Sequence, residues 1–206
     1  MKHMSFRRIA AMLALLCLVP TLLFGMTSCG YKESKEPTDY VCLDVRDYGK
    51  VVIELDAEDA PETVENFKNL VSEGFYDGLV FHRVIEGFMI QGGGFHEDDT
   101  QKETDTINGE FYSNGFANDL KHTPGVVSMA RSNDPNSASS QFFICTDTAD
   151  WLDGDYAAFG IVVDGMDVVY AIEKVATGIH YDKIGYPHED WPRTDVVIRR
   201  AYFVNP

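Results

Sequence analysis

Two segments of this chain carry residues whose types and spacing suit chemistry on an uncharged group. Residues 81–94 read FHRVIEGFMIQGGG, with a cation at Arg83, a bulky apolar pair at Phe88 and Met89, and an amide at Gln91. Residues 140–153 read SQFFICTDTADWLD and add a second amide beside aromatic and apolar side chains. Arginine stays charged and presents several fixed donors. Taken singly, a strand arginine more often pairs with a surface carboxylate and such apolar residues more often pack in a core, so each segment alone is only suggestive.

The standard sequence motifs of hydrolysis, metal chemistry and nucleotide binding are missing. The sequence contains no Gly-x-Ser-x-Gly elbow, no HExxH zinc motif and no phosphate-binding glycine loop. Paired carboxylates in residues 97–99 and 150–155 would suit a glycosidase, but in a chain this acidic surface solvation and turns explain them better. The six histidines are scattered, and no cysteine spacing is typical of zinc. We therefore expect no metal and no cofactor.

The two segments, in this order and at this separation, resemble the active-site framework of the cyclophilin-type peptidyl-prolyl isomerases. The resemblance runs from about residue 41 to residue 204. It implies the family reaction, which is cis/trans rotation about an X-Pro peptide bond. The barrier to that rotation, about 18–20 kcal/mol, comes from resonance in the C–N bond. A donor aimed at the prolyl nitrogen interacts more strongly as the bond twists, and it therefore lowers the barrier.

The resemblance also implies roles for individual residues. The catalytic residues would be Arg83 as the donor, Gln91 steering it, and Phe88. The substrate-binding residues would be Met89, Ala130, Arg131, Ser132, Gln141, Phe143, Trp151, Leu152 and Tyr156. The apolar members beside Phe88 are expected to hold the proline ring, and residues 130–132 to pair with the substrate main chain. Trp151 implies inhibition by the cyclic peptide cyclosporin.

The chain departs from the eukaryotic family pattern at several positions. Tyr156 stands where that pattern has histidine, and it keeps an aromatic wall with a polar tip. Arg131 replaces an asparagine whose contact is expected through the backbone. The loop of residues 132–140 is one residue longer, and the loop after Phe95 aligns poorly, so that Thr100 and Gln101 are only approximate matches. No role is assigned to residues 180–192, whose tryptophan and prolines are expected to pack on the barrel.

The elements that would position these residues are mainly strands. A hairpin is expected over residues 40–46 and 50–55, and a helix from Pro61, with an apolar stripe at helical spacing that ends before Gly74. Further strands are expected at residues 80–84, 89–92, 126–129, 141–145, 159–163 and 196–204, and a second helix at 165–175. Residues 95–116 and 177–194 read as long loops. The count suits a closed eight-stranded antiparallel β-barrel capped by two α-helices, the fold that the resemblance also implies.

The N-terminus has the features of an export signal. Three basic residues precede an apolar run that ends in small residues and Cys29, the pattern of a signal peptide (residues 1–28) with a cysteine that resembles a bacterial lipoprotein box. Cys29 would then carry lipid and anchor the protein to the outside of the cell membrane, through a tether of residues 29–39. An uncleaved anchor and plain secretion are the alternatives, although the run is short for a span and contains Pro20. Residues 40–206 would form the isomerase domain.

Charge and cysteine content limit the partners. Of 17 basic residues three lie in residues 1–28, which leaves 14 against 33 acidic residues and a net charge of −19. Such a surface repels phosphate, so we expect no nucleic-acid partner. Cys42 and Cys145 belong to the folded part, where two buried free thiols are favoured over a disulfide, although spacing alone does not decide this.

The sequence therefore predicts a peptidyl-prolyl isomerase that assists the folding of exported proteins, binds X-Pro segments of unfolded or flexible polypeptides, and is a monomer as the family suggests. Two other functions remain open from the residues alone. One is a proline-binding scaffold with little catalysis, and the other is a holdase chaperone whose isomerase site is incidental.

Overall fold

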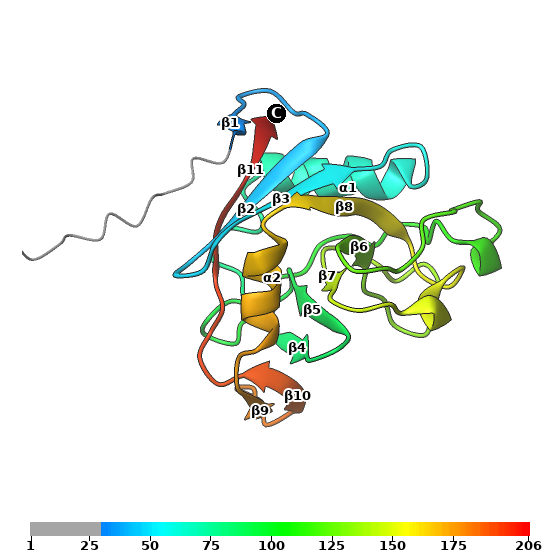
Figure 1. Ribbon diagram of the computed structural model, residues 1–206. Coiled ribbons are helices and arrows are strands. Elements are labelled where there is room, and N and C mark those ends of the chain that lie inside the picture. The colour runs from blue at the N-terminus through cyan, green and yellow to red at the C-terminus, as the bar shows by residue number, and fades with distance from the viewer. Residues whose placement is uncertain (1–29) are drawn as a thin grey trace, which may run out of the picture.

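Eleven strands and two α-helices make up the computed structural model, which describes residues 30–206 (Figure 1). The strands are β1 (Lys32–Glu33), β2 (Tyr40–Val45), β3 (Gly49–Leu55), β4 (Arg83–Ile85), β5 (Met89–Gly92), β6 (Val126–Met129), β7 (Phe142–Cys145), β8 (Ala158–Asp164), β9 (Thr177–Tyr181), β10 (Pro187–Pro192) and β11 (Ile198–Asn205). The helices are α1 (Pro61–Ser72) and α2 (Met166–Glu173), with short 3-10 turns η1 (Tyr112–Asn114) and η2 (Asp150–Leu152). The expected signal peptide and Cys29 lie outside the described residues.

Nine strands form one antiparallel sheet in the order β1-β11-β2-β3-β8-β6-β7-β5-β4. The mainly β architecture with two helices is thus confirmed, but the closed barrel of eight strands is not, because the ladder does not join its outer strands. Where closure would occur, Val80 and Val197 form a single isolated bridge, and Phe81 N–H donates to the carbonyl of Val196 at 2.8 Å. Gly78 N–H also donates to the carbonyl of Ile198, and Ile198 N–H to that of Leu79, both at 2.8 Å, so the two segments share a few backbone hydrogen bonds without adding a strand pair to the ladder.

Helix α1 is held by burial of one face and by a distant carboxylate. The predicted stripe of Val64, Phe67, Leu70 and Val71 is buried, and Pro61 stands in the first turn as expected. No side chain of the preceding loop caps the helix. Instead Glu110, which is buried, accepts hydrogen bonds from the N–H groups of residues 62 and 63 at 2.9 and 2.8 Å. A carboxylate here also complements the positive end of the helix dipole.

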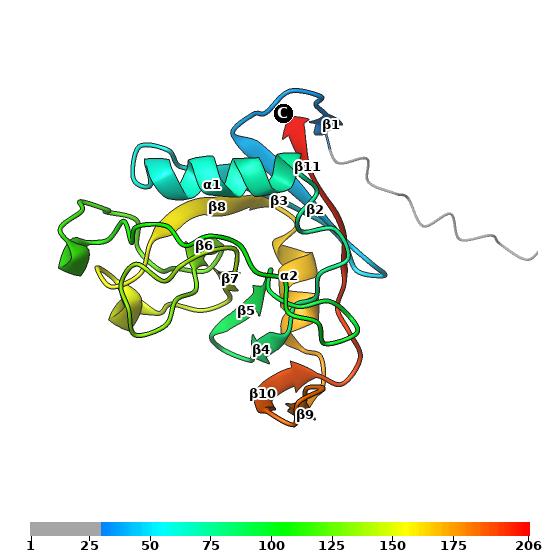
Figure 2. The same ribbon diagram turned by 180° about the vertical axis from the view of Figure 1, so that it is seen from behind.

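The main core lies between the sheet and the two helices. Helix α1 contacts β11 and runs across its direction, and α2 packs against β3, β4 and β5 (Figures 1 and 2). Phe67 of α1 contacts Tyr76, Phe142 and Phe159, with ring centroids 5.1–5.6 Å apart. Since Phe142 opens β7, this aromatic cluster fixes the start of a strand that carries predicted site residues.

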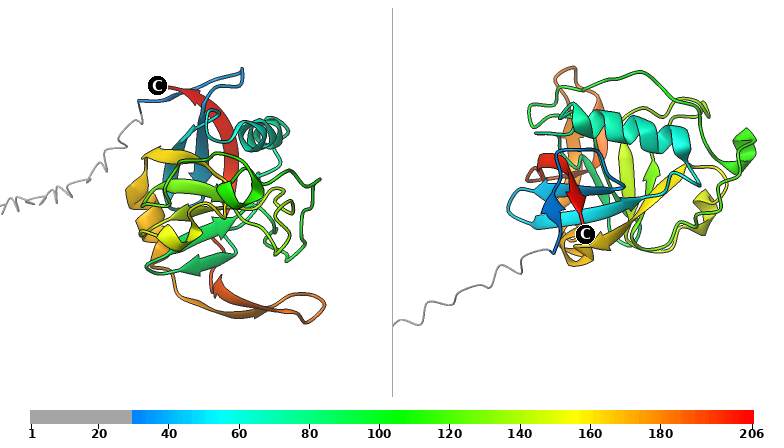
Figure 3. Two further views of the ribbon diagram at one scale, coloured as in Figure 1. Left: turned by 90° about the vertical axis from the view of Figure 1, so that its right-hand side faces the viewer. Right: turned by 90° about the horizontal axis from the view of Figure 1, so that it is seen from above.

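Two segments that the sequence places outside the barrel are joined to the rest of the fold. Residues 177–194, expected to be a loop, form the antiparallel hairpin β9–β10, which projects away from the sheet (Figure 3). Trp191 at its base is buried, as expected. Lys32 and Glu33, within the expected tether, form β1 and pair with β11 beside the C-terminus.

Two further observations bear on the N-terminal predictions and on the thiols. Cys42 and Cys145 are both buried and neither forms a disulfide, which agrees with the favoured alternative. Within residues 30–206, no helix has the length and apolar character needed to cross a membrane.

Candidate active site

Arg83 and Gln91 lie directly opposite one another on the adjacent strands β4 and β5. The turn between these strands is short, so the FHR and GFMIQ segments face each other by local hairpin geometry. The Arg83 side chain is 42% exposed, which leaves its guanidinium able to meet a ligand. Gln91 thus lies beside Arg83, the residue that the family resemblance expects it to steer.

A hydrogen bond between two amides links β5 to the segment that precedes β7. Gln91 Nε2 donates to Gln141 Oε1 at 3.0 Å. The glycine run makes this approach possible, because a Cβ at Gly94 would lie 2.6 Å from the Gln141 amide nitrogen. Gly93 has φ +87, and its Cβ would lie 2.7 Å from the carbonyl oxygen of Ser140. The glycines after Gln91 are thus required by close packing beside the site.

A cavity of about 310 Å³ opens next to Arg83. Nine of the twelve predicted site residues line it: Arg83, Phe88, Met89, Gln91, Ala130, Arg131, Phe143, Leu152 and Tyr156. Its floor is apolar, since Met89, Phe143 and Leu152 are almost fully buried in a small core cluster of their own. An apolar floor with the half-exposed Arg83 at the edge of the cavity suits a small apolar ring that carries a polar atom.

The other three predicted residues lie around this cavity. Trp151 of η2 is 61% exposed and contacts Phe88 at the rim, with ring centroids 5.5 Å apart. Gln141 does not line the cavity but accepts the hydrogen bond from Gln91. Ser132 points into its own loop, where its hydroxyl bonds to that of Ser137 at 2.8 Å. The structure thus does not bring the Ser132 side chain to the pocket.

The family of the chain follows from comparison with known proteins. Residues 40–203 match the family described as cyclophilin type peptidyl-prolyl cis-trans isomerase/CLD. The chain belongs to this cyclophilin family. Peptidyl-prolyl cis-trans isomerase B of Escherichia coli (strain K12) is 46% identical over 159 residues, covering 73% of this chain and 92% of the relative. Peptidyl-prolyl cis-trans isomerase cyp18 of Streptomyces antibioticus is 45% identical over 161 residues, covering 74% and 92%. This chain is accordingly a peptidyl-prolyl cis-trans isomerase.

Solved structures show the same family. A cyclophilin type peptidyl-prolyl cis-trans isomerase of Cryptosporidium parvum, crystallised in the presence of the dipeptide Ala-Pro, matches with a TM-score of 0.63 and 28% identity. The match covers 80% of this chain and 98% of that one.

In this cyclophilin the pocket wall is stiffened by Arg131. Its Nε donates to the carbonyl of Asp155 at 2.9 Å, and its guanidinium lies 4.6 Å from the ring centre of Tyr156. Cation–π contact of this kind favours a fixed ring position. Arg131 and Tyr156 both depart from the eukaryotic family pattern. The Arg131 side chain therefore holds the Tyr156 ring in the pocket wall.

Behind the pocket floor of the cyclophilin lies a buried polar chain that sequence reasoning missed. His122 stacks on Phe143 with its Nδ1 3.0 Å from Asp153 Oδ1 and its Nε2 3.0 Å from Ser128 Oγ. Burial lowers the pKa of His122, although Asp153 opposes this. Burial alone would raise the pKa of Asp153, but hydrogen bonds from His122 lower it overall. Serine, histidine and aspartate in series resemble a hydrolase triad, but Ser128 is fully buried and cannot attack a substrate.

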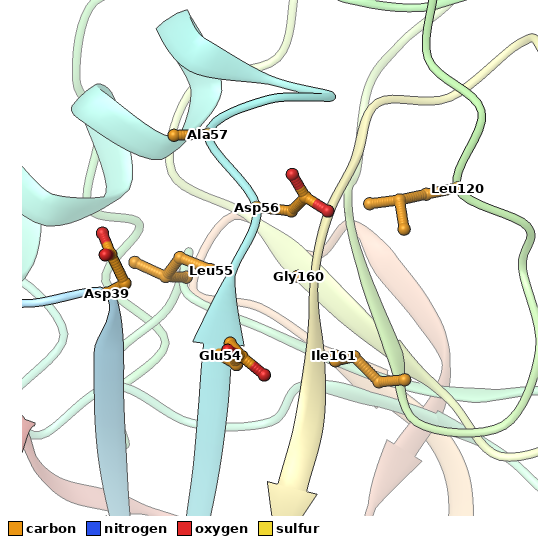
Figure 4. Close-up of a pocket in the computed structure, with 8 residues that line it drawn as sticks. All are labelled: Asp39, Glu54, Leu55, Asp56, Ala57, Leu120, Gly160 and Ile161. Carbon is orange, nitrogen blue, oxygen red and sulfur yellow. The ribbon is translucent and has the colours of Figure 1, made fainter. Parts of the chain in front are cut away.

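A cavity elsewhere in the cyclophilin, between the start of β2, the end of β3 and the first half of β8, offers no comparable chemistry (Figure 4). Its carboxylates are already engaged: Asp39 pairs with Lys68 at 2.6 Å, Glu54 accepts from Tyr40, and Asp56 accepts from the turn that follows it. Among residues 30–206 no group of three or more histidine, cysteine or acidic side chains is arranged to hold a metal.

Proposed function

We propose that Arg83 accelerates X-Pro rotation by donating to the prolyl nitrogen while the proline ring occupies the apolar cavity. The observation that carries this proposal is the position of Arg83, a half-exposed cation at the rim of a cavity floored by Met89, Phe143 and Leu152. A ring bound on that floor would present its nitrogen to Arg83 in preference to Arg131, because the Arg131 side chain is engaged with Asp155 and Tyr156.

The chemical reason is that twisting localises the lone pair on the prolyl nitrogen. In the planar amide that lone pair is delocalised into the carbonyl, so it accepts a hydrogen bond poorly. As the bond rotates the nitrogen becomes a better acceptor, and the interaction with Arg83 strengthens in the transition state. Gln91 and Gln141, bonded to each other, would bind the flanking main chain and keep the peptide in register.

Replacing Arg83 by alanine tests this role. Cis-to-trans exchange of a short X-Pro peptide, followed by NMR, should slow by roughly 100-fold or more relative to the wild type, the scale for a lost transition-state donor. Arg199→Ala is the matched control, because Arg199 is an exposed arginine of β11 that pairs with Asp44 and does not line the pocket; it should exchange like the wild type. An Arg83→Ala protein of normal activity would show that another group is the donor.

We further propose that the protein is a lipoprotein that works outside the cytoplasmic membrane. The basic start, apolar run and small residues before Cys29 support this. Cells fed labelled palmitate should yield labelled protein that lacks residues 1–28, and Cys29→Ser should lose the label. Unlabelled wild-type protein that retains residues 1–28 would instead indicate an uncleaved anchor, and unlabelled protein without them would indicate secretion.

Unfolded or flexible exported proteins are the proposed substrates, and a monomer is the proposed working form. A client whose refolding is limited by an X-Pro bond should refold faster with the wild type than with Arg83→Ala. Equal rates would contradict folding assistance by catalysis, and suppression of aggregation of a proline-free client by both proteins would indicate a holdase. The molar mass measured by light scattering as the protein elutes from a size-exclusion column tests whether it is a monomer.

Cyclosporin is the proposed inhibitor. The support is Trp151, an exposed ring at the pocket rim that contacts Phe88. Truncating an aromatic anchor at an interface weakens binding, here by roughly tenfold, so Trp151→Phe should raise the dissociation constant. Tyr112→Phe, at an exposed ring outside the pocket lining, is the control. Unchanged affinity in Trp151→Phe would remove this residue from the cyclosporin site.

A further inference from the structure

The β9–β10 hairpin is fixed to the rest of the fold beside the active site. Trp191 at its base is buried against Phe95, with ring centroids 5.5 Å apart. Farther out, the loop of residues 98–100 holds it, since Lys183 pairs with Asp98 at 3.0 Å and His180 with Asp99 at 2.8 Å. Figure 3 shows the hairpin, in orange, extending away from the sheet. These contacts hold the hairpin in place beside the active site.

Between this hairpin and the active site lies a second cavity of about 310 Å³. One side consists of β10 residues Pro187, His188, Glu189 and Asp190, and the other includes Arg83 and Gln91. Both Arg83 and Gln91 also line the apolar cavity. A polypeptide whose proline occupies the apolar cavity would therefore place a neighbouring side chain in the second one.

The hairpin presents carboxylates to this second cavity. The register of β9 and β10 shifts between His188 and Trp191, so the two acidic residues form a bulge, and Asp190 has φ +59. Bulges re-aim side chains. Asp190 lies 3.9 Å from Nε of Arg83 and offsets its charge. The exposed Glu189 side chain has no hydrogen bond or ion pair within residues 30–206, which leaves one uncompensated negative charge.

A buried histidine with an unpaired nitrogen is among the residues that line the same cavity. His82 is only 6% exposed, and its Nδ1 has no hydrogen-bond partner among the described residues. An unsatisfied buried polar atom costs about 1–3 kcal/mol, so a ligand that donates to it would recover that cost. Burial, helped by His188, lowers the pKa of His82 to about 4. The imidazole is therefore neutral near pH 7 and does not repel a cation.

We propose that the second cavity is a substrate subsite that binds the lysine or arginine side chain of a residue next to the X-Pro bond. Ammonium and guanidinium groups only donate hydrogen bonds, and Glu189, Asp190 and Nδ1 of His82 supply acceptors. The inference rests on the isomerase activity and adds a preference for basic sequences to it. The hairpin, to which the sequence alone assigned no role, thereby becomes a specificity element.

The test compares peptides that differ at one residue. Peptides with lysine or glutamine at each of the two positions on either side of the proline are assayed for kcat/KM by NMR exchange. The wild type should prefer lysine at one of these positions by roughly two- to fivefold, the range of an exposed ion pair. In E189Q/D190N that lysine-to-glutamine ratio should fall to about one. E65Q removes a charge from the exposed face of α1 and should keep the wild-type ratio.

Each alternative result has a distinct meaning. A lysine-to-glutamine ratio near one at every position in the wild type would overturn the subsite, and so would an unchanged ratio in E189Q/D190N. In either case the glutamine peptides would still exchange rapidly, so the isomerase activity itself would stand. If E65Q lowered the lysine-to-glutamine ratio as much as E189Q/D190N does, the overall charge of the protein would be what attracts basic peptides. That result would also overturn the subsite. Failure to accelerate any peptide would instead contradict the isomerase activity. As a second measurement, the lysine peptide should shift the His82 imidazole NMR signals more than the glutamine peptide does.

Discussion

The carboxylate of Asp190 lies 3.9 Å from Nε of Arg83, although the two residues belong to β10 and β4, which are far apart in the sequence. The contact uses Nε, so the terminal nitrogens of the guanidinium remain available as donors. It also restricts a side chain that otherwise has many rotamers. We therefore expect Asp190 to act as a positioning residue for Arg83.

We predict that Asp190→Asn lowers kcat/KM for a neutral X-Pro peptide by about two- to fivefold, because an exposed pair of this kind contributes up to about 1 kcal/mol. The wild-type value should fall toward that of the variant as salt is added, since salt screens the pair. NMR exchange at low and high salt measures both effects. Equal activity of the two proteins at low salt would show that Arg83 is oriented without Asp190.

Stability at mildly acidic pH should depend on His82. Burial lowers its pKa from the ordinary 6.5 to about 4, so the unfolded chain takes up a proton below pH 6.5 that the folded protein does not yet bind. Stability is complete above about pH 6.5 and is lost as the pH falls toward 4, by about 3 kcal/mol at most. His82→Gln should show a flatter curve.

Urea denaturation of the wild type and His82→Gln between about pH 4 and pH 8 measures this difference. Above about pH 7 the gap between the two proteins should be constant, which serves as the internal control. A gap that does not change with pH anywhere in the range would mean that His82 binds its proton equally in both states.

Glu110 should stabilise helix α1 from outside it. Glu110→Ala leaves the N–H groups of residues 62 and 63 without their carboxylate partner, at a cost of about 1–3 kcal/mol in the free energy of unfolding. Glu65→Ala, on the exposed face of the same helix, should change it by no more than about 0.5 kcal/mol. The midpoints of urea unfolding measure this difference. Similar midpoints for the two variants would show that Glu110 does not stabilise the start of helix α1.

The two domain thiols should be unreactive until the protein unfolds. Burial raises the pKa of Cys145 to about 12, and the thiolate is the reactive species. With Cys17 and Cys29 both replaced by serine, a disulfide reagent at about pH 8 should modify neither Cys42 nor Cys145 in the native protein, and both in denaturant. S72C adds an exposed thiol as a positive control. Rapid modification of the native protein would contradict the burial of these side chains.

Local pattern was sufficient for much of the sheet and for the chemistry of the site. The bounds of β5 and β6 are those predicted, because each is a short apolar run between turn residues. Arg83 and Gln91 also became neighbours as the motif suggested, since one tight turn joins their strands. The candidate site residues were named through the family resemblance, and nine of the twelve line one cavity.

Contacts between distant segments were decided only by the tertiary structure. The Gln91–Gln141 bond, the His122–Asp153 pair and the Glu110 cap each join residues from 31 to 50 positions apart, and no local signal specifies which strands become neighbours. Residues 177–194 read as a loop because a bulge and prolines interrupt the alternation of a strand. The sequence by itself therefore determined which groups could do chemistry and most local elements. The tertiary structure alone decided that the sheet's outer strands do not pair and that the acidic residues of β10 lie beside Arg83. Both depend on pairing between segments that are far apart in the sequence.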